Sequence, residues 1–322
     1  MSYLTQIALP LAAQRRRPIA DLEQTHGITP RSSRMYERFY GLQEVAQQDL
    51  CLGGMLDAAL RQVLEDLPNG GRGLAGQLVY CKTQTHNTFS SDGWLRALAD
   101  AQGLHDWEVM SLSMTSCASA LVQMHVARLL GDAAAPLIIL TGEKAFHPWV
   151  SRLPVGLLAE VPAAALFHPA QPVPGAGGWR IRGSHVQHLP QFHANPDAMS
   201  PEERQALQAA YLPRLIGFLE DSLQRCRDRL SPEMVFLPHN LNLPMTRQIV
   251  DHFGWSARCF QGDVAHIGHG YCSDIFLNLD ALHRDGRPAP QVLVLAAGTG
   301  VTFASCLLDR LSPTQALNED SP

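Results

Sequence analysis

The sequence predicts an α/β protein made of two similar halves, each a sheet covered by helices. Three observations favour this class. Strand-like and helix-like segments alternate along the chain. The 322 residues suffice for one large domain or two similar-sized ones. A stretch rich in proline and glycine, Ala170 to Gly178, is the best candidate linker. We therefore expect halves of 1–172 and 173–322, although no repeat is visible at the level of residue identity.

The first half predicts strands and helices in alternation, interrupted once. The segment from Ile19 to Gly41 is polar and Arg-rich, and we expect an irregular excursion there. Apolar alternation between Val109 and Met114 predicts a buried strand. The other expected strands are Tyr3–Ala8, Gln77–Cys81, Pro136–Thr141 and the apolar stretch Val155–His168, and the expected helices are Leu52–Leu67, Asp92–Gln102 and the segment from Cys117 to Leu130.

The second half repeats this order. A long helix has a strong start signal in Ser200, a capping residue, followed by Pro201 in the first turn. The polar tail after Ser312 is expected to fray. The expected strands are Trp179–Leu189, Met234–Pro238, Ala257–Gln261 and two that are joined through Gly298–Gly300, and the expected helices are Met199–Leu230, Pro244–Phe253 and Ser273–Arg284.

Composition excludes several functional classes. A net charge of −5 and a pI near 6.3 leave no basic stripe for nucleic acid. Seven scattered cysteines without a CxxC pair do not form a disulfide framework, which favours a reducing compartment. The basic residues near the start follow a short apolar run, the wrong order for a secretory signal, and no apolar run reaches the ~20 residues of a membrane span. We expect a soluble, cytoplasmic protein.

Cys117 lies where a predicted strand becomes a helix. Thr115 and Ser116 are candidate N-cap residues, so the thiol would lie at the positive end of the helix. Unpaired backbone N–H groups at this end stabilise a thiolate and make it nucleophilic near neutral pH. The alternative is a buried, unreactive cysteine that packs as a small apolar side chain.

Two histidines supply candidate partners for this cysteine. His239 directly follows a predicted strand, and His269 follows the next one. Because the carboxyl ends of strands in α/β proteins gather at one edge, the two imidazoles can converge although they are remote in sequence. A thiolate beside two imidazoles is suited to covalent acyl chemistry, in which cysteine accepts the acyl group and imidazole handles protons or an oxyanion.

The ordered motifs resemble those of β-ketoacyl-acyl carrier protein synthase III, a family of the thiolase-like superfamily. SMTSCASAL resembles the nucleophile motif, and PHNLN resembles the Pro-His-x-x-Asn motif. HIGHGYCSDIFLNLDALHRDGR is similar to the family's Gly-Asn-Thr-Ser-Ala-Ala-Ser helix, and AAGTGVTFASCLL is similar to the closing glycine-rich hairpin. THNTF stands where the family has a loop that crosses its dimer interface. The similarity extends over nearly the whole chain.

The resemblance implies a thiolase-like fold, two α/β halves packed in layers α-β-α-β-α, and a role for each matching residue. Cys117 would accept the acyl group, with His239 as the first catalytic imidazole and His269 at the position of the family's asparagine. The backbone N–H groups of Cys117 and Thr299 would form the oxyanion hole. Supporting roles fall on Asn242, Asp274, Gly298 and Gly300, and Phe89 would line the acyl pocket. No cofactor and no metal are implied.

Departures from the family pattern point to a specialised enzyme. Histidine at position 269 can act as a general base, which asparagine cannot. A Gly-Asp-Gly-Ala-Gly segment is replaced by LLAEVPAAALF, and the tryptophan and arginine that flank the coenzyme A tunnel fall near Met35 and Phe39. We expect an acyltransferase or condensing enzyme of natural-product, polyketide or fatty-acid-derived biosynthesis. It would take an acyl group from a carrier protein or CoA thioester and pass it to carbon, oxygen or nitrogen of a small-molecule acceptor.

Alternatives remain open at this stage. The chain is expected to form a homodimer, but it is alternatively a non-catalytic or partly degraded partner subunit in a heterodimer. Asp274 either orients His269 or caps the helix that follows it. Two locally dense groups contain possible metal ligands, but neither has the spacing of a closed four-ligand zinc site, so we expect no metal. These groups are His185, His188 and His193, and His266, His269 and Cys272.

Overall fold

The computed structural model describes residues 3–83, 93–130, 135–145, 155–169, 177–192, 199–298 and 301–311. Three of the expected site residues, Phe89, Thr299 and Gly300, lie outside these ranges. So do His193, most of the expected linker and the C-terminal tail.

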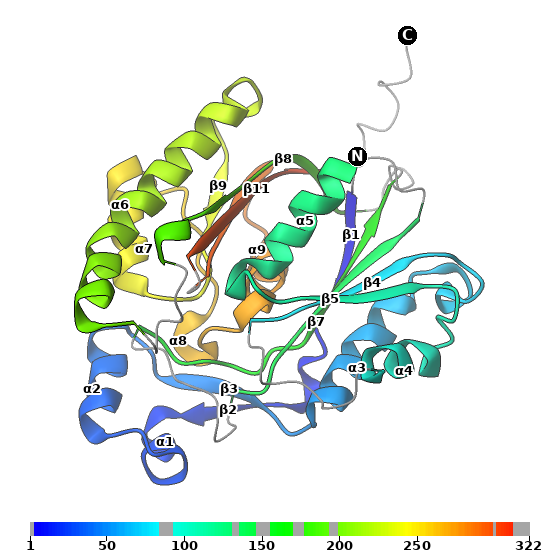
Figure 1. The fold of residues 1–322 in the computed structure, drawn as a ribbon, viewed down its shortest axis with the longest axis horizontal. Helices are drawn as coiled ribbons and strands as arrows, with labels where there is room; N and C mark the ends of the chain where they lie inside the picture. Colours follow the sequence, from blue (N-terminus) through cyan, green and yellow to red (C-terminus); the bar gives the residue numbers. More distant parts are fainter. Residues whose placement is uncertain are drawn as a thin grey trace.

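One large mixed sheet forms the framework of the protein. Its strands are β1 (Tyr3–Ala8), β4 (Gln77–Cys81), β5 (Glu108–Leu112), β6 (Leu137–Thr141), β7 (Ala163–His168), β8 (Trp179–His188), β9 (Val235–Leu237), β10 (Gln291–Ala297) and β11 (Thr302–Arg310). They lie in the order β5-β4-β6-β7-β1-β8-β11-β10-β9 (Figure 1). Strands from the first half of the chain therefore occupy one side of the sheet, and strands from the second half occupy the other. Only two residue pairs join β1 to β8, and the expected boundary at 172/173 stays a prediction.

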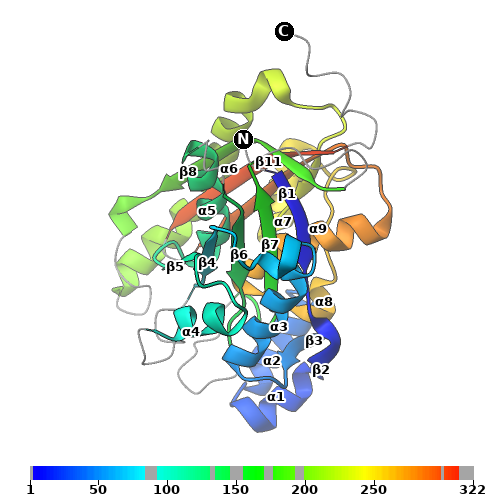
Figure 2. The same cartoon turned by 90° about the vertical axis from the view of Figure 1, so that its right-hand side faces the viewer.

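Helices cover this framework in layers. They are α3 (Leu52–Leu64), α4 (Trp94–Ala101), α5 (Ser119–Leu130), α6 (Pro201–Cys226), α7 (Leu243–Phe253) and α9 (Asp274–Asp285). One hydrophobic cluster joins α3 and α4 to the first half-sheet, and another joins α6 and α7 to the second. A third joins α5 and α9 to strands of both half-sheets, so these two helices lie between the halves (Figures 1 and 2). Helices and half-sheets thus alternate in the layered order α-β-α-β-α that the resemblance implied.

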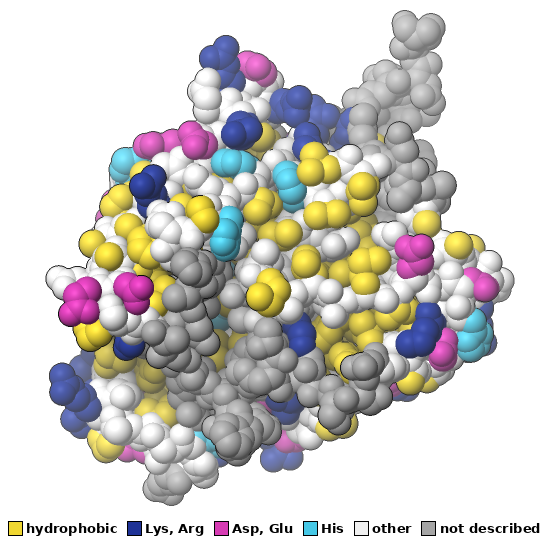
Figure 3. All heavy atoms as spheres, in the orientation of Figure 1, with side chains coloured by type: hydrophobic (Ala, Val, Ile, Leu, Met, Phe, Trp, Pro, Cys, Tyr) yellow, Lys and Arg dark blue, Asp and Glu magenta, His cyan; other side chains and the backbone are white. Residues whose placement is uncertain are grey.

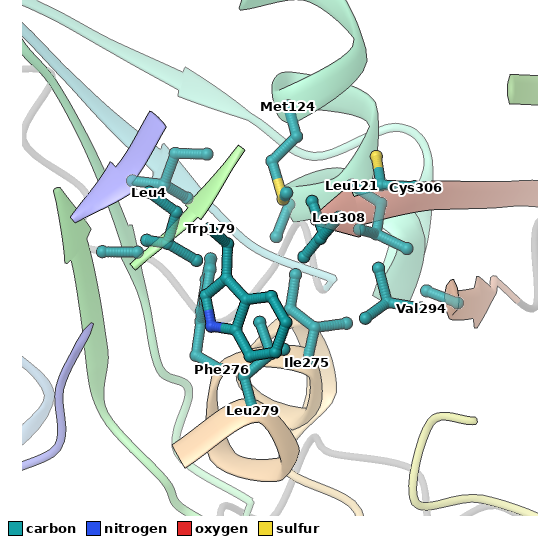
Figure 4. Close-up of a cluster of buried hydrophobic side chains, with 14 of the residues drawn as sticks. Leu4, Leu121, Met124, Trp179, Ile275, Phe276, Leu279, Val294, Cys306 and Leu308 are labelled. Atoms are coloured by element: carbon teal, nitrogen blue, oxygen red, sulfur yellow. The ribbon is translucent and has the colours of Figure 1, made fainter. Parts of the chain in front are cut away.

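The central cluster holds α5 and α9 together between the half-sheets. Leu121 and Met124 of α5 and Phe276 of α9 point into it between the half-sheets (Figure 4), and each is at most 1% exposed. Burying side chains of this size stabilises the fold by about 1.5–3 kcal/mol each. Both helices start with a short 3₁₀ turn, Ser116–Ala118 and Tyr271–Ser273, and these two turns are in contact. The amino-terminal ends of the two helices thus meet at one point of the fold.

The expected irregular excursion at 19–41 is wrong. Instead, α1 (Ile19–His26) and α2 (Pro30–Arg38) form there, flanked by a separate antiparallel pair, β2 (Gln14–Pro18) and β3 (Glu44–Gln48). The Thr29 side chain accepts a hydrogen bond from the N–H of Ser32, and Pro30 occupies the first turn. Tyr36 is buried in a cluster with residues of the second half. A few buried side chains therefore stabilise helices whose sequence is mostly polar.

The second half contains the expected cap of a long helix but lacks one expected strand. Ser200 caps α6, as the sequence predicted, and the side chain of Glu203 bonds back to the N–H of Ser200 to complete a capping box. No strand forms at 257–261, where a single parallel bridge joins Cys259 to Phe236. His269 therefore does not follow a strand. It comes after a short helix, α8 (Val264–Ile267), and its backbone N–H donates to the carbonyl of Leu157.

β5 is an edge strand, so the expectation that this apolar segment is buried is wrong. Met110 is 44% exposed, and Met114, just beyond the strand, is 81% exposed. At the end of α5, Leu129 and Leu130 are also largely exposed. Figure 3 shows hydrophobic side chains gathered on this face. Alternation indicates an extended apolar segment but not which neighbour covers it.

Within the described ranges, no helix has the length and apolar character needed to cross a membrane.

Candidate active site

A strained turn presents Cys117. After β5 the chain turns through Ser116, whose φ of +52° lies in the left-handed region that side chains disfavour. The hydroxyl of Ser119 holds this turn, 2.7 Å from the carbonyl oxygen of Ser116. Thr115 occupies the N-cap position without capping, since its hydroxyl contacts Ser119 instead. Cys117 therefore lies in the 3₁₀ turn that precedes α5, and it is 3% exposed.

Cys117, His269 and Asp274 form a continuous hydrogen-bonded line. Nε2 of His269 lies 3.1 Å from Sγ of Cys117. Nδ1 of the same ring lies 2.5 Å from Oδ2 of Asp274. Because the carboxylate of Asp274 can only accept a hydrogen bond, Nδ1 of His269 carries the proton of this bond. Nε2 of the same ring faces the sulfur of Cys117. A thiol, an imidazole and a carboxylate in this order match the arrangement of nucleophile, base and orienting group in acyl-transfer enzymes.

Asp274 orients His269, and this decides between the two roles that the sequence left open. Its Oδ1 accepts the N–H of Gly270, and its Oδ2 accepts the N–H of Asn240 besides Nδ1 of His269. Three donors therefore hold one carboxylate that is 1% exposed. These three hydrogen bonds fix the position of the Asp274 carboxylate next to the imidazole ring. An ionised carboxylate accepts such bonds best.

The charge neighbours of His269 set its protonation. Burial alone disfavours the imidazolium, but the carboxylate of Asp274, and next the sulfur of Cys117, outweigh burial and raise the pKa of His269 well above its usual range. The raised pKa therefore favours the imidazolium form of His269. Any loss of negative charge at the sulfur of Cys117 removes one of the two supports for this raised pKa.

His239 is a neutral imidazole whose proton lies on Nε2. Its Nδ1 accepts the backbone N–H of Ala297 at 3.4 Å, so the proton of the neutral ring is on Nε2. Within the described residues this buried Nε2 has no hydrogen-bond partner. The ring centroids of His239 and His269 are 5.6 Å apart. Burial, and then the neighbouring His269, lower the pKa of His239 to about 3. Among the described residues, the site thus contains one hydrogen-bond donor without a partner, Nε2–H of His239. It also contains one imidazole that can carry charge, that of His269.

The depressed pKa of His239 predicts acid sensitivity. The unfolded chain binds a proton at this histidine below pH ~6.5, whereas the folded chain does not until pH ~3. The stabilisation is therefore present above pH ~6.5 and is lost as pH falls. Between about pH 6 and 4.5, the unfolding free energy of wild type should fall more steeply than that of His239→Asn, by about 1.4 kcal/mol per pH unit. Urea unfolding at each pH measures this difference, and parallel curves for the two proteins would contradict it.

The remaining expected residues are distributed around this centre. Asn242 caps α7 through its side chain, with a φ of +54°, and this is a structural role. Gly298 packs against the Cys117 turn, where a β-carbon would lie 2.5 Å from the carbonyl oxygen of Thr115. The residue that follows β10 thus lies against the Cys117 turn at a position that requires glycine. Phe89, Thr299 and Gly300 lie outside the described residues, and their roles stay predictions.

The structure brings to the site three residues that the sequence did not mark as catalytic. Thr83 lies next to the sulfur atoms of both Cys117 and Cys272, and Glu143 accepts the backbone N–H of Thr83 at 2.6 Å. Thr83, Glu143 and His239 each come two residues after the end of a strand, namely β4, β6 and β9. That positional signal was available, whereas the proximity of Cys272 depends on how α9 packs.

The histidine groups considered as metal ligands are separated in the structure. His185 and His188 lie against the hydroxyls of Ser222 and Thr302, respectively. His266 is on the surface, bonded to Asp263 and Gln43. In the described part of the chain, no three His, Cys, Asp or Glu side chains are placed to hold a metal ion.

Residues 230–310 match the family model for the C-terminal part of 3-oxoacyl-[acyl-carrier-protein] synthase III. The synthase III from Aquifex aeolicus VF5 superposes with a TM-score of 0.75 at 14% identity, over 96% of this chain and 100% of that one. This is the synthase III fold. No curated protein matched in the sequence comparison.

Two further structures share the synthase III fold. The acyltransferase ChlB3 superposes with a TM-score of 0.77 at 16% identity, over 97% of this chain and 98% of that one. Xanthomonas campestris OleA with bound lauric acid and lauroyl-CoA gives 0.74 at 15% identity, over 96% and 98%. The resemblance seen in the motifs is therefore confirmed at the level of the fold, which condensing enzymes and acyltransferases share.

Proposed function

We propose that the protein is an acyltransferase that carries an acyl group on Cys117 and delivers it to a hydroxyl or amine of a small molecule. The observation that supports this most directly is the line Cys117–His269–Asp274. An asparagine at position 269 would serve an oxyanion but could not remove a proton, whereas an Asp-oriented imidazole can. A specialised pathway of fatty-acid-derived or polyketide products is a natural setting for such an enzyme.

The first step is loading of the acyl group. The Cys117 thiolate attacks the carbonyl carbon of the donor thioester, and a new C–S bond forms. Nε2–H of His239, which has no other partner in the described residues, donates to the oxyanion together with the backbone N–H of Cys117. As the donor's C–S bond breaks, Nε2 of His269 gives its proton to the departing thiolate. The enzyme is then acylated, and His269 is neutral.

The second step is transfer to the acceptor. With the thiolate charge gone, the pKa of His269 is supported by Asp274 alone, so the neutral ring can act as a base. Nε2 takes the proton of the hydroxyl or amine as that group attacks the thioester carbonyl. The Cys117 C–S bond breaks, the product leaves, and thiolate and imidazolium are regenerated. No external proton donor is consumed over the cycle.

A carrier protein is the proposed donor. Helix α2 exposes Arg31, Arg34 and Arg38, and within the described residues none of them forms an ion pair. Its buried Tyr36 packs in one cluster with Leu157, whose carbonyl accepts the N–H of His269. The positively charged surface of α2 thus lies close to the site. Its charge is complementary to that of a partner with an acidic surface.

Reversing charge on α2 tests this donor. In the double variant Arg34→Glu/Arg38→Glu, loading from an acyl carrier protein should slow about tenfold at low salt, because electrostatic attraction governs the encounter. Loading from the same acyl group on a small uncharged thiol should not change. Arg61→Glu on α3 is the matched control for a reversed surface charge. Equal slowing with both donors would place the defect in the site itself.

We also propose that two copies pair through the exposed apolar face of β5 and α5. An unpaired edge strand with exposed Met110 and large apolar side chains nearby is a poor surface to leave in water. Sedimentation would then give twice the 35.3 kDa of one chain.

All seven cysteines are free, which supports a reducing, cytoplasmic location, and thiol titration of the protein isolated from cells tests this.

The function is tested by incubating the protein with acyl groups of graded length on CoA and on carrier protein, and measuring intact mass. A mass increase equal to the acyl group, followed by its loss when a hydroxyl or amine acceptor is added, is the expected result. Loss only with a malonyl thioester, with release of CO₂, would assign carbon–carbon condensation instead. Absence of any adduct would favour the alternative of a non-catalytic partner subunit. The intact line of hydrogen bonds from Cys117 through His269 to Asp274 argues against that alternative.

A further inference from the structure

Thr83 places a hydroxyl between two sulfur atoms. It follows β4 directly, and its Oγ1 lies 3.5 Å from Sγ of Cys117 and 3.7 Å from Sγ of Cys272. Both distances are within hydrogen-bonding range for sulfur. A hydroxyl has one hydrogen, so Thr83 donates to one sulfur at a time.

Two anchors fix Thr83 relative to the nucleophile. Its backbone N–H donates to Oε1 of Glu143 at 2.6 Å, and this carboxylate is 1% exposed. The preceding carbonyl, that of Lys82, lies 3.2 Å from the hydroxyl of Ser119, which also holds the Cys117 turn. The backbone at Thr83 is thus tied to both the neighbouring strand end and the turn that presents the sulfur. Rigid placement of this kind is what a hydroxyl needs to act on a reacting atom.

Cys272 is the weaker of the two acceptors. Its own S–H donates to the carbonyl of Ser116 at 3.5 Å, which leaves its sulfur lone pairs for Thr83. Burial first, and then the negative charges at Glu143 and Cys117, raise the pKa of Cys272 well above its usual range. Cys272 therefore stays a neutral thiol, while Cys117 is the sulfur that alternates between thiolate and thioester. A charged acceptor attracts the hydroxyl far more strongly than a neutral one.

We propose that Thr83 is a catalytic residue whose hydroxyl donates to the Cys117 thiolate and turns to Cys272 while Cys117 is acylated. No bond is made or broken at Thr83, and it transfers no proton. Because the donation is strongest when negative charge is on the sulfur, it favours formation of the thiolate before attack and its departure in the transfer step. The part of this inference that concerns the acyl-enzyme rests on the proposed function.

Alkylation of Cys117 tests the inference without any acyl donor. The thiolate displaces iodide from iodoacetamide, so the rate against pH reports how readily the sulfur ionises. His239, His269, Asp274 and Glu143 are the other titratable groups around it, with Tyr271 and Cys272 from the turn before α9 and Tyr211 from α6. All of these are retained in the variants at position 83, so a change in the profile reports the hydroxyl.

In Thr83→Val, which removes the hydroxyl and keeps the shape, the midpoint of the alkylation profile should move up by about one pH unit, and alkylation below the midpoint should slow about tenfold. Thr83→Ser should restore the wild-type profile. Thr141→Val is the matched control, because Thr141 ends the adjacent strand β6 and bonds Ser273 Oγ instead of a sulfur. Cys272→Ala removes the competing acceptor and should not raise the midpoint.

Several outcomes would overturn the inference. One is an unchanged midpoint in Thr83→Val, and another is a serine variant that behaves like the valine variant. A shift of the same size in Thr141→Val would show that the effect is structural. If Thr83→Val does not fold by circular dichroism, Thr83→Ala and ultraviolet titration of the thiolate replace it. A shifted profile with no acyl adduct from any thioester would reject the proposed function while leaving the role of Thr83 intact.

Discussion

Replacing Cys117 with alanine is expected to abolish acyl loading completely. The substitution removes the sulfur that lies 3.1 Å from Nε2 of His269 and leaves the site without an atom that can form the thioester. Turnover should fall by on the order of 10⁴-fold or more, as it does when a covalent nucleophile is removed from a triad-like site. Intact-protein mass spectrometry after incubation with the donor that loads wild type measures the result directly.

The control for this experiment addresses adventitious acylation. Cys51 is exposed, so it is the thiol most open to non-enzymatic acylation. Cys51→Ser should retain one acyl group per chain, and peptide mapping should place that group on Cys117. An adduct of equal stoichiometry on Cys117→Ala would contradict the assignment of the nucleophile, and the same map would then identify the true acceptor.

Replacing His269 with asparagine should separate the two steps of the reaction. Asparagine can still donate a hydrogen bond to Asp274, but it cannot accept the proton of an incoming hydroxyl or amine. Transfer should therefore slow by about 10²- to 10⁴-fold, the usual contribution of a general base. Loading should slow less, because a departing thiolate needs little protonation. The expected result is an acyl-enzyme that forms and then persists after the acceptor is added.

The measurement is a single-turnover chase of the preloaded enzyme, followed by mass spectrometry at several pH values. Wild-type transfer should rise with pH as neutral His269 becomes available, and this dependence should disappear in His269→Asn. His266→Asn is the matched control, since His266 is a partly exposed histidine three residues away that bonds Asp263 and Gln43. Transfer at the wild-type rate in His269→Asn would mean that the base is another group and would favour carbon–carbon condensation. Asp274→Asn is a less clean test, because that carboxylate also accepts two backbone N–H groups.

The sequence by itself determined the class of fold and most of the regular elements. Strands such as Gln77–Cys81 and helices such as the one capped by Ser200 have strong local signals, because strands alternate with period two and helix ends need capping groups. It also singled out Cys117 and His239, which follow the ends of β5 and β9, and it singled out His269, although the strand expected before His269 does not form. What failed were segments whose structure depends on remote partners: α2 is stabilised by burial of Tyr36, and β5 is an edge that its own pattern predicts to be buried.

Only the tertiary structure decided the chemistry of the site. Whether Asp274 caps a helix or orients His269 depends on a distance of 2.5 Å between residues five apart in the chain, and both outcomes fit the same sequence. The position of the His239 proton on Nε2 follows from a bond to Ala297, 58 residues away. The contact between Thr83 and Cys117 follows from packing of two strand ends against the start of α5. Local patterns encode local hydrogen bonds and burial, whereas the protonation and aim of a catalytic group are set by neighbours that only folding brings within a few ångströms.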